Sequence, residues 1–197
     1  MSEKRATKPS ARQRILETAQ RLFYAEGVRA VGIDRIIAEA GVAKMTLYNH
    51  FPSKDDLILA VLEQREVEVD AMFAEAIKRL VNKGRTKLEA FFLALEEWFH
   101  NDGFRGCSFI NTLVELADRE HPASRFSSAH KRRFHELLGQ IIAEEHGTEV
   151  AQEVTPAIAI LVEGAIITAQ LEGSANPARV AARASRTMID EVKRRSR

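Results

Sequence analysis

Cysteine is nearly absent from this sequence. Cys107 is the only one in 197 residues, which excludes an intrachain disulfide and fits a reducing cytoplasm. The first residues lack the apolar stretch of a secretory signal, so we expect no signal peptide. The most apolar window, residues 156–171, contains Glu163 and is shorter than the roughly 20 residues that a membrane-spanning helix needs. We therefore expect a cytoplasmic protein that makes no membrane contact.

Catalytic signatures are also missing. The chain contains no nucleophile elbow, phosphate-binding loop or dinucleotide fingerprint. Glu97 and His100 form a Glu-x-x-His pair, but a di-iron bundle needs two such pairs, and no second one exists. His130 and His135 would point away from one another on a helix, which makes them a poor metal pair. We predict no enzyme and no cofactor or metal, with an all-helical metalloenzyme as an alternative.

The chain as a whole has almost no excess of positive or negative charge, but its N-terminal part has an excess of positive charge. The formal net charge is +1, yet residues 1–52 contain nine basic and five acidic residues. A basic N-terminal part on a slightly acidic body suggests a polyanionic partner at one end only. Residues 1–9 hold three of these basic residues, which could contact phosphates, but a solvated tail is the better explanation for them.

Alternation with the period of a β-strand is not found in any stretch, whereas apolar residues recur at helical spacing throughout. We predict an all-α fold of about nine helices. Three short helices form an N-terminal helix-turn-helix head, and the others form a larger C-terminal helical bundle. The predicted ranges are 10–27, 33–41, 44–51, 54–80, 86–101, 107–118, 123–145, 149–172 and 177–195.

The segment Lys44–Phe51 has an unusual composition for a short helix. Leu47 and Phe51 can face inward, while the remaining side chains cannot all be buried. The segment contains no acidic residue, which would repel phosphates, but it contains hydroxyls, an amide, an imidazole and a lysine, which can donate to phosphates or read base edges. The alternative is a short solvent-exposed helix that lacks acids by chance.

Helix-ending signals surround this segment and define the predicted domains. Gly41 makes the tight turn before it, and Pro52 and Ser53 separate it from a long helix. We predict a flexible basic arm over residues 1–9, a helix-turn-helix DNA-binding domain over 10–53, and a ligand-binding and dimerisation domain over 54–197.

The motif Gly-Val-x-x-x-Thr-Leu-Tyr-x-His-Phe-x-x-Lys at residues 41–54, with the apolar residues that precede it, resembles the DNA-binding head of the tetracycline-repressor (TetR) family. The resemblance covers about the first 60 residues. It implies an all-helical homodimer, a ligand cavity in the larger domain, and repression relieved by a small molecule. By the same resemblance, Thr46, Tyr48 and His50 contact the DNA backbone and Lys54 contacts a phosphate.

Two positions depart from the family pattern. Ala43 stands where a Ser or Thr helix cap is usual, and the loss of such a cap costs about 1 kcal/mol. Met45 stands where a small residue is common, and it can pack on a thymine methyl. Because Asn bonds adenine edges and Lys bonds guanine edges, our candidates for base readout are Lys44, Met45 and Asn49.

Dimerisation is predicted because a single recognition helix contacts too few base pairs. The stretch 156–167 is apolar nearly all round, which indicates burial on two sides, although a fully internal helix would look the same. The final helix presents small residues that permit close approach. The predicted interface residues are Ile160, Gly164, Ile167, Leu171, Ala181, Ala184 and Met188.

Large apolar residues with a few polar ones among them suit a cavity for an apolar effector, although each can equally belong to the core. Cys107 is a possible thiol sensor, but a buried inert cysteine is the simpler interpretation. The candidate ligand-binding residues are Phe91, Leu95, Trp98, Phe99, Cys107, Phe109, Asn111, Phe126, His130, Phe134, Glu163 and Ile167.

Together these features predict a homodimeric repressor that a small, largely apolar ligand releases from a palindromic operator in double-stranded DNA. The sequence identifies neither the effector nor the operator. A DNA-binding protein that responds to no ligand is the alternative, and the large, aromatic-rich, non-basic body argues against it.

Overall fold

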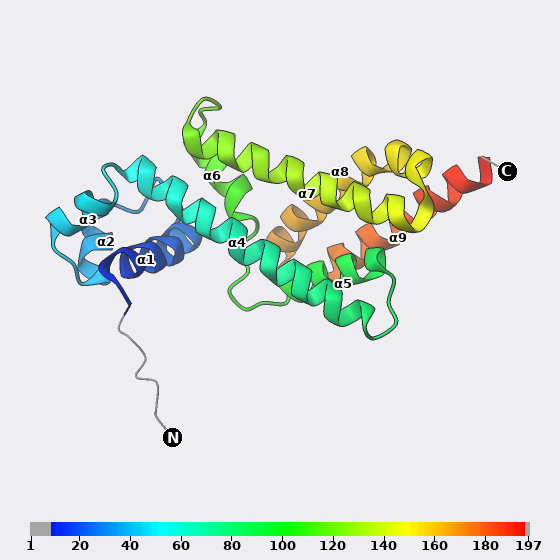
Figure 1. Cartoon of the computed structure of the whole chain (residues 1–197), viewed down its shortest axis with the longest axis horizontal. Coiled ribbons are helices and arrows are strands. Elements are labelled where there is room, and N and C mark those ends of the chain that lie inside the picture. Colours follow the sequence, from blue (N-terminus) through cyan, green and yellow to red (C-terminus); the bar gives the residue numbers. More distant parts are fainter. Residues whose placement is uncertain (1–8, 196–197) are drawn as a thin grey trace, which may run out of the picture. The chain divides into compact units, whose positions relative to one another are not determined.

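The structure is a computed structural model that describes residues 9–195, and the described chain contains nine helices and no strand (Figure 1). The all-α prediction is confirmed, and the predicted helix ends agree with the observed ones to within a few residues. The predicted basic arm, except Pro9, lies outside the described residues. The helices are α1 (Ala11–Glu26), α2 (Ile33–Ala40), α3 (Lys44–His50), α4 (Lys54–Val81), α5 (Lys87–Phe99), α6 (Ser108–Leu116), α7 (Pro122–His146), α8 (Thr148–Glu172) and α9 (Asn176–Arg195).

The chain forms two compact units. The head unit contains the chain up to Arg65 together with Asn111–Ser127, and the body unit contains Glu66–Ile110 and the chain from Ser128 onward. Helices α4, α6 and α7 therefore each contribute residues to both units. Each unit contains segments from two parts of the chain. The predicted division into a DNA-binding domain that ends at residue 53 and a ligand-binding domain that begins at residue 54 therefore stays a prediction.

The head unit is built on caps and apolar faces that are readable in the sequence. The Ser10 hydroxyl accepts a hydrogen bond from the Gln13 N–H at 3.1 Å and starts α1. Gly41, in the left-handed conformation, ends α2. The core of the unit consists of fully buried side chains from four helices: Ile15, Leu22, Ile36, Leu47 and Leu57.

The end of α6 packs against the turn between α1 and α2 inside the head unit. The backbone N–H of Arg29 donates to Glu115 Oε2 at 3.0 Å, and the Arg29 guanidinium donates to the Leu116 carbonyl at 3.0 Å. Gly27 has a φ of +93°, and a Cβ there would lie 2.6 Å from Glu115 Oε2. Residues far apart in the sequence thus fix this turn.

The body unit has an aromatic core. Phe73 of α4 lies with its ring centroid 5.9 Å from Phe91, 6.1 Å from Trp98 and 5.7 Å from Phe134. Such tilted and edge-on pairs add to the stabilisation that burial alone provides. The core therefore joins α4, α5 and α7, and α9 packs against both α5 and α8.

Helix α8 is the one helix among residues 9–195 whose length and composition alone would allow it to cross a membrane. In its most apolar window, 39% of the residues are buried inside the protein, and core helices of soluble proteins have the same composition. The helix is 25 residues long, which is longer than the apolar window 156–171 on which we based the expectation of no membrane contact. That expectation stays a prediction.

Candidate nucleic-acid interface

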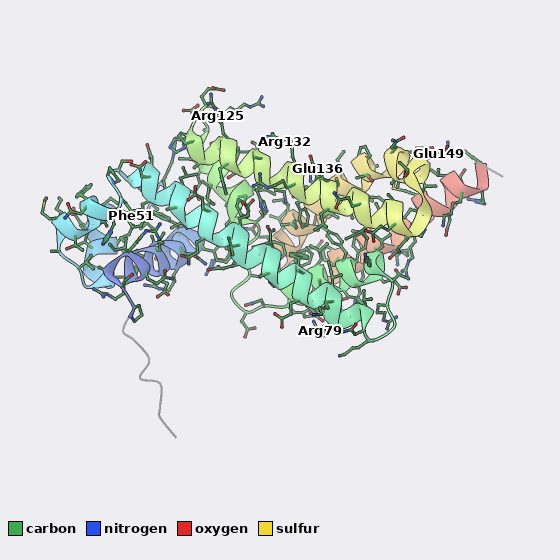
Figure 2. The ribbon with its side chains drawn as sticks, viewed as in Figure 1. Phe51, Arg79, Arg125, Arg132, Glu136 and Glu149 are labelled. Atoms are coloured by element: carbon green, nitrogen blue, oxygen red, sulfur yellow. The ribbon has the colours of Figure 1, made fainter. Side chains whose placement is uncertain are left out.

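Helix α3 exposes nearly all the side chains that were predicted to bind DNA. Leu47 and Phe51, the second of which Figure 2 labels, are buried and hold the helix. Five of the six predicted DNA-binding residues on this helix are exposed, and the sixth, Thr46, is half-buried. Met45 is 69% exposed, so a partner that lies on α3 can bury it.

Two features determine how firmly α3 is held. Its N-cap is Ala43, which makes no side-chain capping bond, so one stabilising contact is missing as expected. At the other end, the Arg12 guanidinium lies 5.3 Å from the centroid of the Phe51 ring, an attractive cation–π geometry. Arg12 was not predicted as a site residue, because its proximity to α3 arises only from the tertiary fold.

Several basic residues of the head unit are bound to other groups of the protein, which makes them less available to DNA phosphates. Arg35 binds both Glu26 and Glu39, and Arg21 binds Glu39 at 2.5 Å. Hydrogen bonds to Glu26 and Glu39 raise the pKa of Arg35 above its ordinary value. Arg14 donates to the carbonyls of Ala40 and Pro9. Much of the basic surplus of the N-terminal region therefore serves the fold.

Three cations of the head unit lie on α3 or close to its ends: Lys44, Lys54 and Arg12. Lys44 forms only a long, exposed pair with Asp34 at 3.5 Å. Lys54 begins α4, which Ser53 caps by accepting from the Asp56 N–H at 3.0 Å. Partial burial lowers the pKa of Lys54. Together with Arg12, which lies against Phe51, these residues put positive charge at both ends of α3.

The predicted ligand residues divide between the two units. Asn111 and Phe126 belong to the head unit, and the other ten belong to the body unit. Within the body unit, Phe109 stacks on His130 with ring centroids 3.6 Å apart. Burial lowers the pKa of His130, and this buried imidazole hydrogen-bonds Glu66 at 2.9 Å. The structure thus brings several of the predicted residues together.

A polar cluster lies beside these aromatic rings. Glu163 Oε1 is 2.6 Å from Lys131 Nζ and 2.9 Å from His135 Nε2. Glu163 Oε2 is buried and has no hydrogen-bond partner among the described residues. Burial raises the pKa of the Cys107 thiol, which keeps it protonated and unreactive. Lys131 was missed by the sequence analysis, because lysine is usually solvent-exposed.

A cavity of about 480 Å³ lies between α4 and α7 in the body unit. Of the predicted ligand residues, His130 and Phe134 line it. Phe73, Ile77 and Leu137 supply further apolar lining, and Glu66 and Asp70 supply carboxylates.

The predicted dimer residues are partly exposed and partly buried. Ile160 is 73% exposed and Leu171 is 80% exposed, and Ile167 is also exposed. Gly164 has open space where a Cβ would stand. On α9, Ala184 and Met188 are half-buried and Ala181 is buried. Val180, which is exposed on α9, was not in the predicted set.

Within residues 9–195, no group of three or more histidine, cysteine, aspartate or glutamate side chains is placed to hold a metal ion. The Glu97 carboxylate binds Arg79 at 2.5 Å, and the His100 ring hydrogen-bonds the Glu96 carbonyl. The one Glu-x-x-His pair of the sequence thus serves local structure.

Comparison with known proteins agrees with this architecture. Residues 15–61 match the family model described as bacterial regulatory proteins, tetR family, and residues 84–185 match the model described as tetracyclin repressor-like, C-terminal domain. A TetR-family transcriptional regulator from Streptomyces coelicolor is 33% identical, with a TM-score of 0.78 over 92% of this chain and 95% of that one. The chain belongs to the TetR family of transcriptional regulators and carries its helix-turn-helix DNA-binding head.

Curated relatives match over shorter regions. The transcriptional activator FasR of Mycolicibacterium smegmatis is 33% identical over 104 residues, which are 51% of this chain and 47% of FasR. A transcriptional regulator of Staphylococcus aureus is 42% identical over 67 residues, which are 34% of this chain and 36% of that protein. The chain thus spans about half the length of these relatives or less, and their partners are not carried over.

Proposed function

We propose that this protein is a cytoplasmic, homodimeric repressor without enzymatic activity, which binds a palindromic DNA operator through α3 and releases it when a small, largely apolar effector binds the body unit. The observation that carries the proposal is the exposed face of α3, which contains no acid and has positive charge at both ends.

The roles on α3 divide into positioning and reading. Thr46, Tyr48 and His50 seat the helix on the DNA backbone, and Lys54 and Arg12 add phosphate contacts. Lys44, Met45 and Asn49 choose the sequence, since they can reach base edges in the major groove. Phosphate contacts supply affinity for every sequence, whereas base contacts supply discrimination.

Substitutions at Lys54 and Asn49 separate these two roles. We expect Lys54→Ala to weaken binding to operator and to random DNA alike, and to lower the dependence of log K on log salt by about one unit. We expect Asn49→Ala to cost about 1–3 kcal/mol on the operator and to leave random-DNA binding nearly unchanged. Fluorescence anisotropy on both DNAs across a salt series measures both effects.

The control is Lys78→Ala, which removes a lysine at the far end of the same helix, α4, from Lys54. It should bind both DNAs as the wild type does. Normal operator affinity in Tyr48→Ala or Lys54→Ala would contradict the assignment of α3 as the DNA-binding helix.

The effector hypothesis rests on the aromatic core and on the unpartnered Glu163 Oε2. A buried carboxylate oxygen without a donor costs free energy, and a ligand with one donor group would satisfy it while its apolar part packs on Phe109 and Phe134. We expect apolar compounds with a hydroxyl or amine to release operator DNA from the wild type, and Glu163→Gln to require a higher concentration. An unchanged response in Glu163→Gln would place the ligand elsewhere.

The effector can release DNA only if it binds more tightly to the protein conformation that has low affinity for DNA than to the conformation that binds DNA well. In the DNA-bound state, the two recognition helices of a dimer lie one turn of DNA apart, roughly 34–36 Å. Helices α4, α6 and α7 contribute residues to both units, so a ligand that displaces them in the body acts on the same helices in the head. Spacing between the two heads, measured by double electron–electron resonance, should change when inducer is added.

Activation is the second candidate, favoured by the similarity to FasR, which is named an activator. A reporter gene under an operator that this protein selects from random DNA distinguishes the two candidates. Deletion of this protein raises expression if it is a repressor and lowers it if it is an activator.

A further inference from the structure

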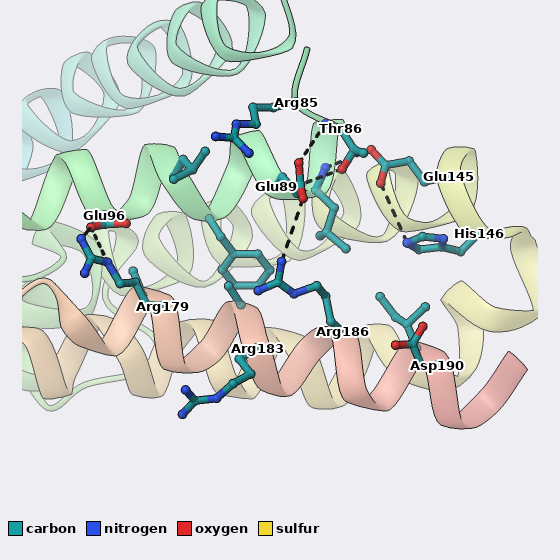
Figure 3. A pocket seen from close by; sticks show the side chains of 16 residues that line it. Arg85, Thr86, Glu89, Glu96, Glu145, His146, Arg179, Arg183, Arg186 and Asp190 are labelled. Atoms are coloured by element: carbon teal, nitrogen blue, oxygen red, sulfur yellow. Dashed lines mark hydrogen bonds and ion pairs between the residues drawn. The ribbon is translucent and has the colours of Figure 1, made fainter. Parts of the chain in front are cut away.

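A second pocket of the body unit lies between α5 and α9, on residues that neither the DNA-binding surface nor the predicted effector set uses (Figure 3). Its volume is about 580 Å³, within the range of small-molecule sites. Its α9 residues also differ from the predicted dimer residues on that helix, so a dimer through those residues leaves the groove free. The floor is apolar: Leu88, Phe92, Leu93, Ala178, Ala182 and Ile189.

Arginines and carboxylates form the rim of this groove. Arg179 reaches from α9 to Glu96 on α5, with Nε 2.7 Å from Oε1. Arg186 points toward Glu89 but stops at 4.0 Å, the outer limit of an ion pair. Figure 3 shows both arginines crossing from α9 toward α5. The first pair is therefore closed, and the second is loose.

Glu89 is held weakly on its other side as well. Its Oε2 accepts from the Thr86 N–H at 3.4 Å, which is long for a hydrogen bond. Exposed ion pairs of this kind contribute little stability. A carboxylate from outside can therefore take the place of Glu89 at Arg186 at small cost.

Two other charges orient such a ligand. The Arg85 side chain forms no ion pair among the described residues and lines the α5 side of the groove. Asp190 lies with His146 at the end that α7 closes, and burial lowers the pKa of His146, which keeps that imidazole neutral. Glu145 adds a second carboxylate at this end, and Lys193 Nζ lies 2.9 Å from His146 Nδ1. The two carboxylates outnumber this one cation, so an anionic head is attracted to Arg85 and Arg186 instead.

We propose that the α5–α9 groove binds a small amphipathic carboxylate, whose head replaces Glu89 at Arg186 beside Arg85 and whose apolar body covers the groove floor. Arginine is suited to the head because its planar guanidinium can donate two parallel hydrogen bonds to a carboxylate. The floor supplies the apolar contact. The site is separate from the effector cluster at Glu163.

The test uses octanoate as the probe and methyl spectra of the full-length protein labelled with ¹³C at alanine. We expect octanoate to shift the methyl signals of Ala178 and Ala182 saturably and to leave that of the head-unit Ala19 unchanged. Octylammonium has the same chain with the opposite charge, and inorganic phosphate is an anion without a chain. Neither should produce these shifts at the same concentration.

Three variants locate the head of the ligand. Arg186→Ala should weaken octanoate binding about tenfold, as expected for a hydrogen bond to a charged group. Glu89→Gln removes the competing carboxylate, and glutamine still suits the helix cap, so we expect binding about two- to fivefold tighter. Arg194→Ala is the matched control, because Arg194 is on the same helix but is not among the residues that line the groove, and it should bind as the wild type does.

Equal shifts with octylammonium, or unchanged octanoate affinity in a folded Arg186→Ala, would overturn the proposal. Shifts confined to alanines outside the groove would also overturn it, since they would place the carboxylate elsewhere. If the ion pairs only stabilised the fold, Glu89→Gln would not bind octanoate more tightly than the wild type does. Tighter binding therefore supports a ligand site.

Discussion

Gly27 is a single residue on which the head unit depends for two separate reasons. Its φ of +93° lies in a region that L side chains rarely adopt. Its lack of a Cβ also lets Glu115 approach closely enough to accept the Arg29 N–H. The first reason is local, whereas the second comes from a residue of α6 that lies far away in the sequence.

Gly84 separates these two reasons experimentally. It has a φ of +85°, but nothing lies within 4 Å of the position of its Cβ. We expect both Gly84→Ala and Gly27→Ala to destabilise the fold, and Gly27→Ala to cost about 1–2 kcal/mol more, because Glu115 must move and lose its hydrogen bond. Urea unfolding measures the difference. Equal costs would mean that the Glu115 contact contributes no stability.

At the scale of elements, α3 is the helix with the weakest local support. It is only 7 residues long and has no side-chain cap, whereas Ser10 caps α1 and Ser53 caps α4. A helix this short is not stable on its own, so Leu47 and Phe51 hold it by burial. We therefore expect part of the free energy of DNA binding to be used in ordering this helix.

A cap introduced at Ala43 should stabilise α3. The backbone there is already extended, with φ −75° and ψ 151°, so a serine can accept a first-turn N–H without rearrangement. We expect Ala43→Ser to raise the free energy of unfolding by about 1 kcal/mol, to slow amide hydrogen exchange in α3, and to tighten operator binding. Ser10→Ala, which removes the α1 cap, should lower stability by a similar amount.

Slower exchange in α3 without any gain in DNA affinity would show that the helix is already ordered before it meets DNA. The ordering cost would then not contribute to operator affinity.

At the scale of the whole molecule, the apolar residues that α8 and α9 leave exposed need a partner. Ile160 and Leu171 are the most exposed large apolar residues on α8. In a two-fold symmetric dimer, the same surface of each copy meets the other. These residues are thus suited to a second copy of the chain.

Charge on this face should separate the copies. We expect Ile160→Glu to raise the dimer dissociation constant at least tenfold, since interfaces depend on a few buried apolar anchors, and to weaken operator binding. Val67→Glu is the control, because Val67 is 70% exposed on α4, outside both helices. Sedimentation of the wild type as a monomer near 22.1 kDa at micromolar concentration would remove the dimer hypothesis.

Local chemistry determined which parts of this protein could be predicted from its sequence. Ser10, Gly41 and Ser53 act on their own turns, and Leu47 and Phe51 fall on the inner face of one short helix, so the helices and the exposed face of α3 follow from the sequence. The family motif over residues 41–54 is equally local. Its side chains lie on one short helix and the cap that follows it.

Contacts between distant segments were decided only by the tertiary structure. Arg21 pairs with Glu39 and Arg35 with Glu26, Arg12 meets Phe51, and Asn111 belongs to the head unit rather than to the body. No spacing in the sequence encodes these pairings, because each depends on how separate helices pack. The sequence by itself determined which residues α3 exposes, and the fold decided which nearby charges are taken up in ion pairs, since ion pairs form between whichever side chains the packing brings together.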